Sequence, residues 1–148
     1  MSGFGIIHAI EILMVEDNPG DVRLTIEALK DGKVYNHLHA VEDGVMALDF
    51  LYRREPYTQA PRPDLILLDL NLPKLNGREV LAAIKSDDAL KTIPVVILTS
   101  SQAEEDILRA YSLHANCYIA KPVGFGEFLN IVKTIETFWL TIVSLPPK

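Results

Sequence analysis

The chain has 148 residues, of which 49% are apolar and 23% are charged, and its formal net charge is −6. This length and composition suit one domain with a buried core and exclude a disordered chain. The acidic balance, with no cluster of Lys and Arg, argues against a nucleic-acid-binding surface. The single cysteine, Cys117, excludes a disulfide framework and a cysteine-based metal site, so we expect an inert core residue there.

The N-terminal segment lacks the basic residues of a signal peptide, and no apolar run reaches the length of a membrane span. We therefore expect a cytoplasmic protein with no membrane partner. No internal repeat divides the chain, so a single domain is predicted over residues 1–148, with its core over 9–138.

Five short apolar runs are expected to form strands. They lie at residues 9–15, 37–41, 65–68, 93–99 and 117–120. Runs that are apolar throughout are typical of strands covered on both faces of a parallel sheet. The run at 37–41 alternates instead, so we expect it at an edge of the sheet. Its two histidines, His37 and His39, are expected to face solvent, because two histidines without further ligands are weak evidence of a metal site.

Segments with helical signals separate these runs. The first helix is expected to begin at Pro19, with Asp17 or Asn18 as its cap, and to end near Gly32. The other expected helices are at 43–55, from Asn76, from Ser101 and, last in the chain, at 125–145. The alternation of strands and helices predicts an α/β fold with a doubly wound, mostly parallel sheet.

Polar residues end four of the five apolar runs. The first run ends in Glu16 and Asp17, the third in Asp69, the fourth in Thr99 and the fifth in Lys121. In a doubly wound sheet, the functional crevice lies outside the carboxyl ends of the strands. We therefore expect three carboxylates, a hydroxyl and an ammonium group to meet at one edge of the sheet.

Three carboxylates at one edge would repel one another and destabilise the fold unless a cation lay among them. Oxygen ligands with few fixed protein groups suit Mg²⁺, which keeps several waters and favours sites shared with phosphate. Lys121 is then a point charge for a phosphoryl oxygen, and Thr99 is a hydrogen-bond donor to a second. A carboxylate nucleophile, Mg²⁺ and a lysine together indicate phosphoryl transfer to Asp69.

The sequence resembles the receiver domains of two-component response regulators over residues 9–138. Four fragments carry the resemblance in this order: VEDN (15–18), LILLDLNLPKLNG (65–77), VILTSS (96–101) and YIAKP (118–122). The resemblance implies a flavodoxin-like sheet of five parallel strands in the order 2-1-3-4-5. It also implies a signalling protein that accepts phosphate, with no enzymatic role beyond catalysing its own phosphorylation and dephosphorylation.

The resemblance assigns the metal ligands. Asp69 would be the phospho-acceptor, and Mg²⁺ would be held by Asp69 and Asp17 directly, by Glu16 through water and by the backbone carbonyl of Asn71. Glu16 stands where an aspartate is commoner in the family. The additional methylene group is expected to shift the water-bridged side of the site only slightly.

The resemblance also assigns the groups around the phosphate. Thr99 and Lys121 would hold the phosphoryl group, and Tyr118 would be the aromatic switch that turns inward when Thr99 moves. The Lys121–Pro122 peptide bond would be cis. Many relatives have an acidic residue where Gly124 stands, and the glycines beside Phe125 leave the start of the last helix open.

Longer fragments are similar to the small response regulators of cyanobacterial and bacterial phytochromes. These fragments are VEDNPGDVRLTIEAL, FLYRREPY, APRPDLILLDLNLPK and GREVLAAIK. The likeness implies a phytochrome with a histidine-kinase module as phosphate donor. The alternative is a phosphorelay intermediate that serves a different sensor kinase.

Two other classes of protein are alternatives to the signalling switch. A phosphatase with an aspartyl-phosphate intermediate needs a second aspartate two residues after the nucleophile, where this chain has Asn71. A flavodoxin-like cofactor module needs a phosphate-binding loop after the first strand. The acidic segment EDNPGD (16–21) would repel a phosphate there in the absence of a metal. The switch is therefore preferred.

The C-terminal segment carries more apolar residues than one buried helix face can use. Phe138 and Trp139 are among those that point partly away from the expected core. We expect this segment to form a homodimer interface with these two residues as anchors. No helix-turn-helix pattern follows it, so we expect output through protein contacts and no nucleic-acid partner.

Overall fold

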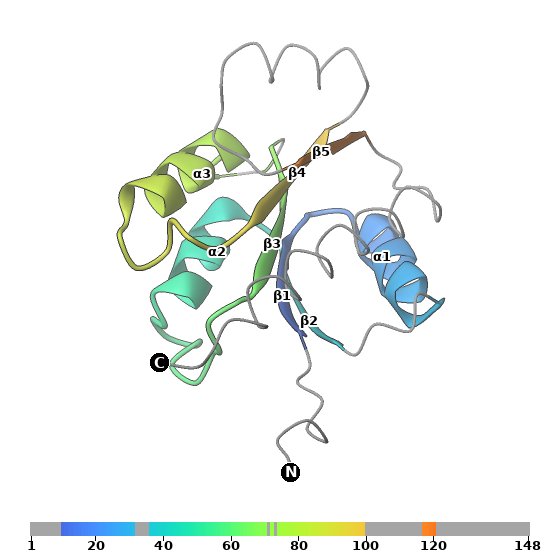
Figure 1. Ribbon diagram of the computed structural model, residues 1–148, viewed down its shortest axis with the longest axis horizontal. Coiled ribbons are helices and arrows are strands. Elements are labelled where there is room, and N and C mark those ends of the chain that lie inside the picture. The colour runs from blue at the N-terminus through green and yellow to red at the C-terminus, as the bar shows by residue number, and fades with distance from the viewer. Residues whose placement is uncertain (1–9, 32–35, 71, 73, 100–116, 121–148) are drawn as a thin grey trace, which may run out of the picture.

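The computed structural model describes residues 10–31, 36–70, 72, 74–99 and 117–120. Its centre is a five-stranded parallel sheet in the order β2-β1-β3-β4-β5 (Figure 1). The strands are β1 (Ile10–Val15), β2 (Asn36–Val41), β3 (Leu65–Asp69), β4 (Val95–Thr99) and β5 (Cys117–Ala120). The predicted fold class and strand order are confirmed, and the alternating strand β2 lies at an edge as expected.

Helices cover both faces of the sheet. The helix α1 (Pro19–Asp31) lies on one face, and α2 (Gly44–Leu51) and α3 (Gly77–Ser86) lie on the other (Figure 1). No helix among the described residues is long and apolar enough to cross a membrane. The expected helices from Ser101 and at 125–145 lie outside the described residues.

The side chains before and within the helices explain where α1 and α3 begin. The Asn18 side-chain oxygen accepts hydrogen bonds from the backbone N–H groups of Gly20 (2.8 Å) and Asp21 (3.2 Å), so Asn18 caps α1. Asn76 and Glu79 form a reciprocal capping box at the start of α3. The predicted start of α3 at Asn76 is confirmed.

The predicted length of α2 was wrong, because the helix ends at Leu51 and does not reach residue 55. Arg53 has a left-handed backbone (φ 54°) and donates its N–H to the Phe50 carbonyl, while Arg54 donates to the Asp49 carbonyl. This pair of hydrogen bonds is a Schellman motif, which ends a helix. Pro56 also disfavours helical backbone at the residue before it. Tyr and Arg are residue types that helices accept, so the sequence at 52–54 does not mark this end.

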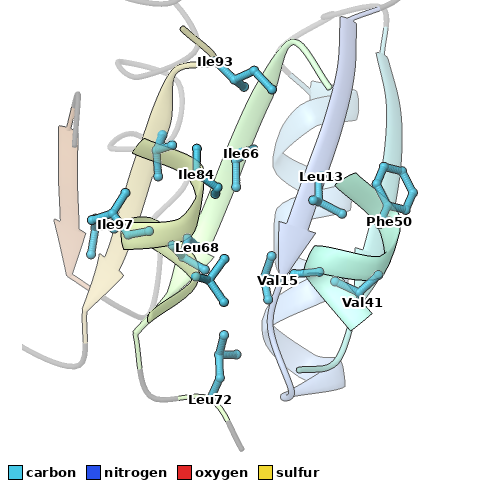
Figure 2. Packing of buried hydrophobic residues seen from close by; sticks show 14 of the residues in the cluster. Leu13, Val15, Val41, Phe50, Ile66, Leu68, Leu72, Ile84, Ile93 and Ile97 are labelled. Atoms are coloured by element: carbon cyan, nitrogen blue, oxygen red, sulfur yellow. The ribbon is translucent and has the colours of Figure 1, made fainter. Parts of the chain in front are cut away.

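Alternate residues along the central strands pack on opposite faces. Leu13 and Val15 of β1 belong to the cluster under α2 and α3, together with Ile66 and Leu68 of β3 (Figure 2). Their neighbours Ile12 and Met14, with Leu65 and Leu67, belong to the cluster under α1, which includes Leu29. Because both faces bury apolar side chains, these strands are apolar throughout, as predicted.

The edge strand β2 shares with β1 a cluster of polar side chains that the sequence did not reveal. Glu11 and His37 are partners in the register of β1 and β2. Glu11 contacts the His37 Nδ1 at 2.9 Å through one carboxylate oxygen and the His39 Nε2 at 2.8 Å through the other. His37 is exposed as expected, whereas His39 is half-buried and packs against the Phe50 ring.

Removing the carboxylate of Glu11 is expected to give a pH-dependent loss of stability. Burial acts to raise the pKa of Glu11, but hydrogen bonds with His39 and His37 outweigh it and lower the pKa from 4.5. A carboxyl group with a lowered pKa stabilises the folded state above its unfolded pKa and loses this effect as the pH falls through its folded pKa. The destabilisation by Glu11→Gln should therefore be full at pH 7 and shrink below pH 4.5.

Urea unfolding of Glu11→Gln and wild type at pH 7 and at acidic pH measures this difference. Glu27→Gln, at an exposed position of α1, is the matched control. A destabilisation by Glu11→Gln that stays constant across this pH range would contradict the prediction.

Candidate metal and phosphorylation site

Three carboxylates meet at the carboxyl edge of the sheet. Val15 of β1 is the register partner of Leu68 of β3, so the residues that follow them, Glu16 and Asp69, leave the sheet side by side. Asp17 follows Glu16. One ligand oxygen from each of these three carboxylates can be chosen so that all three lie within 4.8 Å of one another. The predicted convergence of Glu16, Asp17 and Asp69 is confirmed.

Burial differs within this group. Asp69 is 1% exposed and Glu16 is 2% exposed, whereas Asp17 is exposed to solvent. The backbone N–H of Glu16 donates to the Val41 carbonyl at 3.0 Å, and the backbone N–H of Asn18 donates to the Glu16 carboxylate at 3.2 Å. These bonds hold Glu16 beside Val41, the last residue of β2. Asp17 lies on the solvent-exposed side of the group.

The donor set of this group suits a divalent cation. Burying negative charge is costly unless an opposite charge compensates for it, and two of these three carboxylates are buried. Carboxylate oxygens without nitrogen or sulfur donors favour Mg²⁺ or Mn²⁺ over softer metals. Glu16, Asp17 and Asp69 are the residues that would hold the ion. The bound cation would supply charge neutralisation during attack by a carboxylate on phosphorus.

The backbone places two further predicted residues near the same edge. Thr99 ends β4, which pairs with β3 through Asp69 and Leu98, and Thr99 is the register partner of Ala120 in β5. Tyr118 lies within β5 opposite Ile97. Their side chains are outside the described part of the structure.

The other predicted site residues also lie outside the described residues. They are Asn71, Lys121 with its peptide bond to Pro122, and the two proposed interface residues Phe138 and Trp139. Their roles remain predictions.

One buried carboxylate at this edge was missed in the sequence. Asp43 follows the end of β2, and its side chain is 7% exposed. Its Oδ1 accepts a hydrogen bond from the Met46 N–H at 2.8 Å, and its Oδ2 lies 3.5 Å from the Lys74 Nζ. The strand-end rule, applied to the run at 37–41 as it was to the other four, would have identified Asp43.

Comparisons with known proteins agree with this geometry. A family model for the response regulator receiver domain matches residues 12–133. The response regulator Rcp1 of Synechocystis sp. is 49% identical over 135 residues, which cover 91% of this chain and 92% of Rcp1.

Two solved structures are similar over nearly their whole length. The phosphorylated cyanobacterial phytochrome response regulator RcpA matches with a TM-score of 0.75 and 51% identity, covering 95% of this chain and 100% of RcpA. The Mn²⁺-bound form of Rcp1 matches with a TM-score of 0.74 and 48% identity, covering 93% of this chain and 99% of Rcp1. With its parallel sheet and its carboxylates at the strand ends, the chain belongs to the response regulator receiver domain family.

Proposed function

We propose that this response regulator accepts a phosphoryl group on Asp69 in a reaction that requires Mg²⁺. The observation that carries the proposal is the grouping of Asp69 with Glu16 and Asp17, whose ligand oxygens lie within 4.8 Å of one another. Asp69 is the last residue of β3, so its carboxylate lies where a strand leaves the core. A cation held by the other two carboxylates would offset the charge that otherwise repels a phosphate from this edge.

The chemistry is the transfer of a phosphoryl group from a phosphohistidine of the donor to the Asp69 carboxylate. A carboxylate oxygen of Asp69 attacks the phosphorus of a phosphohistidine, the P–N bond breaks, and the histidine of the donor leaves with the electron pair. A bound Mg²⁺ would supply neutralisation of the charge on the transferring group, and Thr99 and Lys121 would hold its other oxygens. Asn71 would contribute a backbone carbonyl to the metal. These last three roles follow from the family pattern.

The donor in this proposal is a sensor histidine kinase, and specifically a phytochrome. RcpA, at 51% identity, is described as a phytochrome response regulator, and the bacteriophytochrome response regulator RtBRR matches at 44% identity. A relay for a non-phytochrome kinase is the alternative.

Phosphotransfer tests both the function and the donor. A phytochrome histidine kinase and an unrelated histidine kinase are each labelled with radioactive phosphate and mixed with the protein and Mg²⁺. Faster labelling of Asp69 from the phytochrome supports the full proposal. Equal or slower labelling supports the alternative donor. Labelling that persists when Mg²⁺ is chelated would overturn the metal requirement.

The aromatic switch and the tail carry the proposed output. Phosphorylation biases a two-state element formed by Thr99, Tyr118 and the segment after β5, and this change strengthens pairing between two copies of the chain. The proposal assigns signalling to protein contacts and not to DNA.

The variant Trp139→Ala is expected to elute at a smaller apparent mass than wild type in size-exclusion chromatography. Truncating an aromatic anchor at the centre of an interface typically costs about 2 kcal/mol or more of binding energy. Tyr52→Ala, which removes an exposed aromatic residue at the end of α2, is the control. An elution volume of Trp139→Ala equal to wild type at all loading concentrations would contradict the dimer proposal.

A further inference from the structure

The chain that leaves Asp69 is packed against the start of α2. Residues 70–76 connect β3 to α3. A Cβ atom added at Gly44, the first residue of α2, would overlap the Leu75 carbonyl oxygen and lie 2.8 Å from both the Leu75 carbonyl carbon and a Val80 methyl group. The backbones of α2 and of this loop therefore touch without an intervening side chain.

An ion pair lies next to the contact between Leu75 and Gly44. Lys74, directly before Leu75, places its Nζ 3.5 Å from the Asp43 Oδ2, and Asp43 directly precedes Gly44. The Asp43 carboxylate is 7% exposed and also caps α2 through its other oxygen, which accepts from the Met46 N–H. Asp43 is thus held by the helix, and the more exposed Lys74 side chain reaches it from the loop.

The backbone of Lys74 shows that this position is held by its surroundings. Its φ angle is 63°, in the left-handed region that costs a residue with a Cβ atom about 1 kcal/mol or more. Lysine has no local side-chain hydrogen bond that favours this region, unlike asparagine or aspartate. The packing of Leu75 on Gly44 and the attraction between Lys74 and Asp43 are the interactions that compensate.

The two ends of the loop are joined to each other next to Asp69. The loop begins directly after Asp69, and at its far end the Gly77 N–H donates to the Leu70 carbonyl at 3.1 Å. The contact of Lys74 and Leu75 with α2 lies between these two ends. Lys74 and Leu75 therefore contact α2 from a loop whose first residue, Leu70, directly follows Asp69.

We propose that Lys74 is a positioning residue for the metal and phosphorylation site, acting through its ion pair with Asp43. The pair ties the chain that leaves Asp69 to α2, so the three carboxylates are arranged for the cation before the cation binds. This inference rests on the proposed function of Asp69 and adds to it a residue that does not touch the metal or the phosphate.

The exposure of Lys74 limits the expected effect of the ion pair on metal affinity. The Lys74 side chain is 69% exposed, and an ion pair with one exposed partner contributes little to stability. Without the ion pair, the cation must order the loop as it binds. The free energy lost in this way is no larger than the ion pair contributed. We therefore expect Lys74→Gln to raise the Kd for Mn²⁺ about 2- to 5-fold.

The test compares five variants with wild type: four single variants and the double variant of Lys74→Gln with Asp43→Asn. Free Mn²⁺ is counted by its electron paramagnetic resonance signal, and phosphoryl uptake from acetyl phosphate is followed by intact mass at low and at saturating Mg²⁺. Lys91→Gln is the matched control, because Lys91 is 52% exposed and pairs with Asp88 outside the site. Asp43→Asn removes the charge and keeps the cap, since asparagine caps as well as aspartate. Lys74→Arg keeps the charge.

The positioning role predicts a specific pattern. Lys74→Gln and Asp43→Asn weaken Mn²⁺ binding to the same extent, and the double variant is no weaker than either single variant. Saturating Mg²⁺ restores the uptake rate of Lys74→Gln, and Lys74→Arg binds Mn²⁺ as wild type does. Lys91→Gln is unchanged in both measurements.

Two results would overturn the inference: the same Mn²⁺ affinity in Lys74→Gln as in Lys91→Gln, or effects of Lys74→Gln and Asp43→Asn that multiply in the double variant. Failure of the proposed function can be distinguished from failure of this inference. In that case wild type takes up no phosphate on Asp69, while the Mn²⁺ measurements still decide the role of Lys74.

Discussion

Wild-type protein incubated with Mg²⁺ and acetyl phosphate is expected to gain one phosphoryl group in intact mass, whereas Asp69→Asn is expected to gain none. An amide cannot attack phosphorus to form a mixed anhydride, and it removes one anionic ligand from the carboxylate group. Asparagine is close in size to aspartate, so the fold should tolerate the change at this buried position.

The control for this experiment is Asp88→Asn, since the Asp88 side chain is 94% exposed and lies outside the carboxylate group. It should gain the phosphoryl group as wild type does, and chelation of Mg²⁺ should prevent the gain in both. A gain that persists in Asp69→Asn would show that another residue is the acceptor. A protein that reacts only with its kinase would be labelled in the phosphotransfer experiment and not by acetyl phosphate.

Gly77→Ala is expected to destabilise the fold by about 1–3 kcal/mol, as overpacking of a close contact does. A Cβ atom at this first residue of α3 would overlap the Asp69 carbonyl oxygen and lie 2.5 Å from the Leu70 Cα and 2.9 Å from a Leu70 methyl group. Two of these neighbours are backbone atoms, which cannot turn away as a flexible side chain can. Relief requires the start of α3 to move away from the end of β3.

The displacement should weaken metal binding as well as stability, because the backbone of Asp69 is one of the groups that must give way. Urea unfolding and Mn²⁺ titration measure the two effects. Gly20→Ala is the matched control, since a Cβ atom there would meet only the Asn18 side-chain oxygen, at 3.1 Å. We expect it to stay within about 1 kcal/mol of wild type, because alanine is the better helix residue. Equal stability of the two variants would contradict the argument.

The carboxylate group shows why the site could be predicted from sequence. The pair Glu16 and Asp17 lies far from Asp69 in the chain, yet the pair and Asp69 each stand at the end of an apolar run. In a parallel sheet every such run leaves at the same edge, so the position of a residue at the end of its strand is sufficient to place it. Their grouping within 4.8 Å follows from this rule.

Sequence patterns do not predict where a helix or strand ends when the end depends on an unusual backbone conformation. The helix predicted at 43–55 ends at Leu51, because Arg53 has a left-handed backbone. Arginine carries no sequence signal for a left-handed backbone, because glycine and asparagine usually occupy such positions. The same is true of Lys74, whose φ angle is 63° in a loop that contacts α2 through Leu75 and through the ion pair with Asp43.

The amino-acid sequence by itself determined the order of strands and helices, the edge strand β2 and the carboxylates at the ends of β1 and β3. These features depend on local periodicity and on the residue at each strand end. Only the tertiary structure decided that Glu11 meets two histidines, that Lys74 reaches Asp43 and that Gly77 lies against Asp69. The reason is physical: such contacts join side chains or backbones from different elements, and their distances are set by how those elements pack.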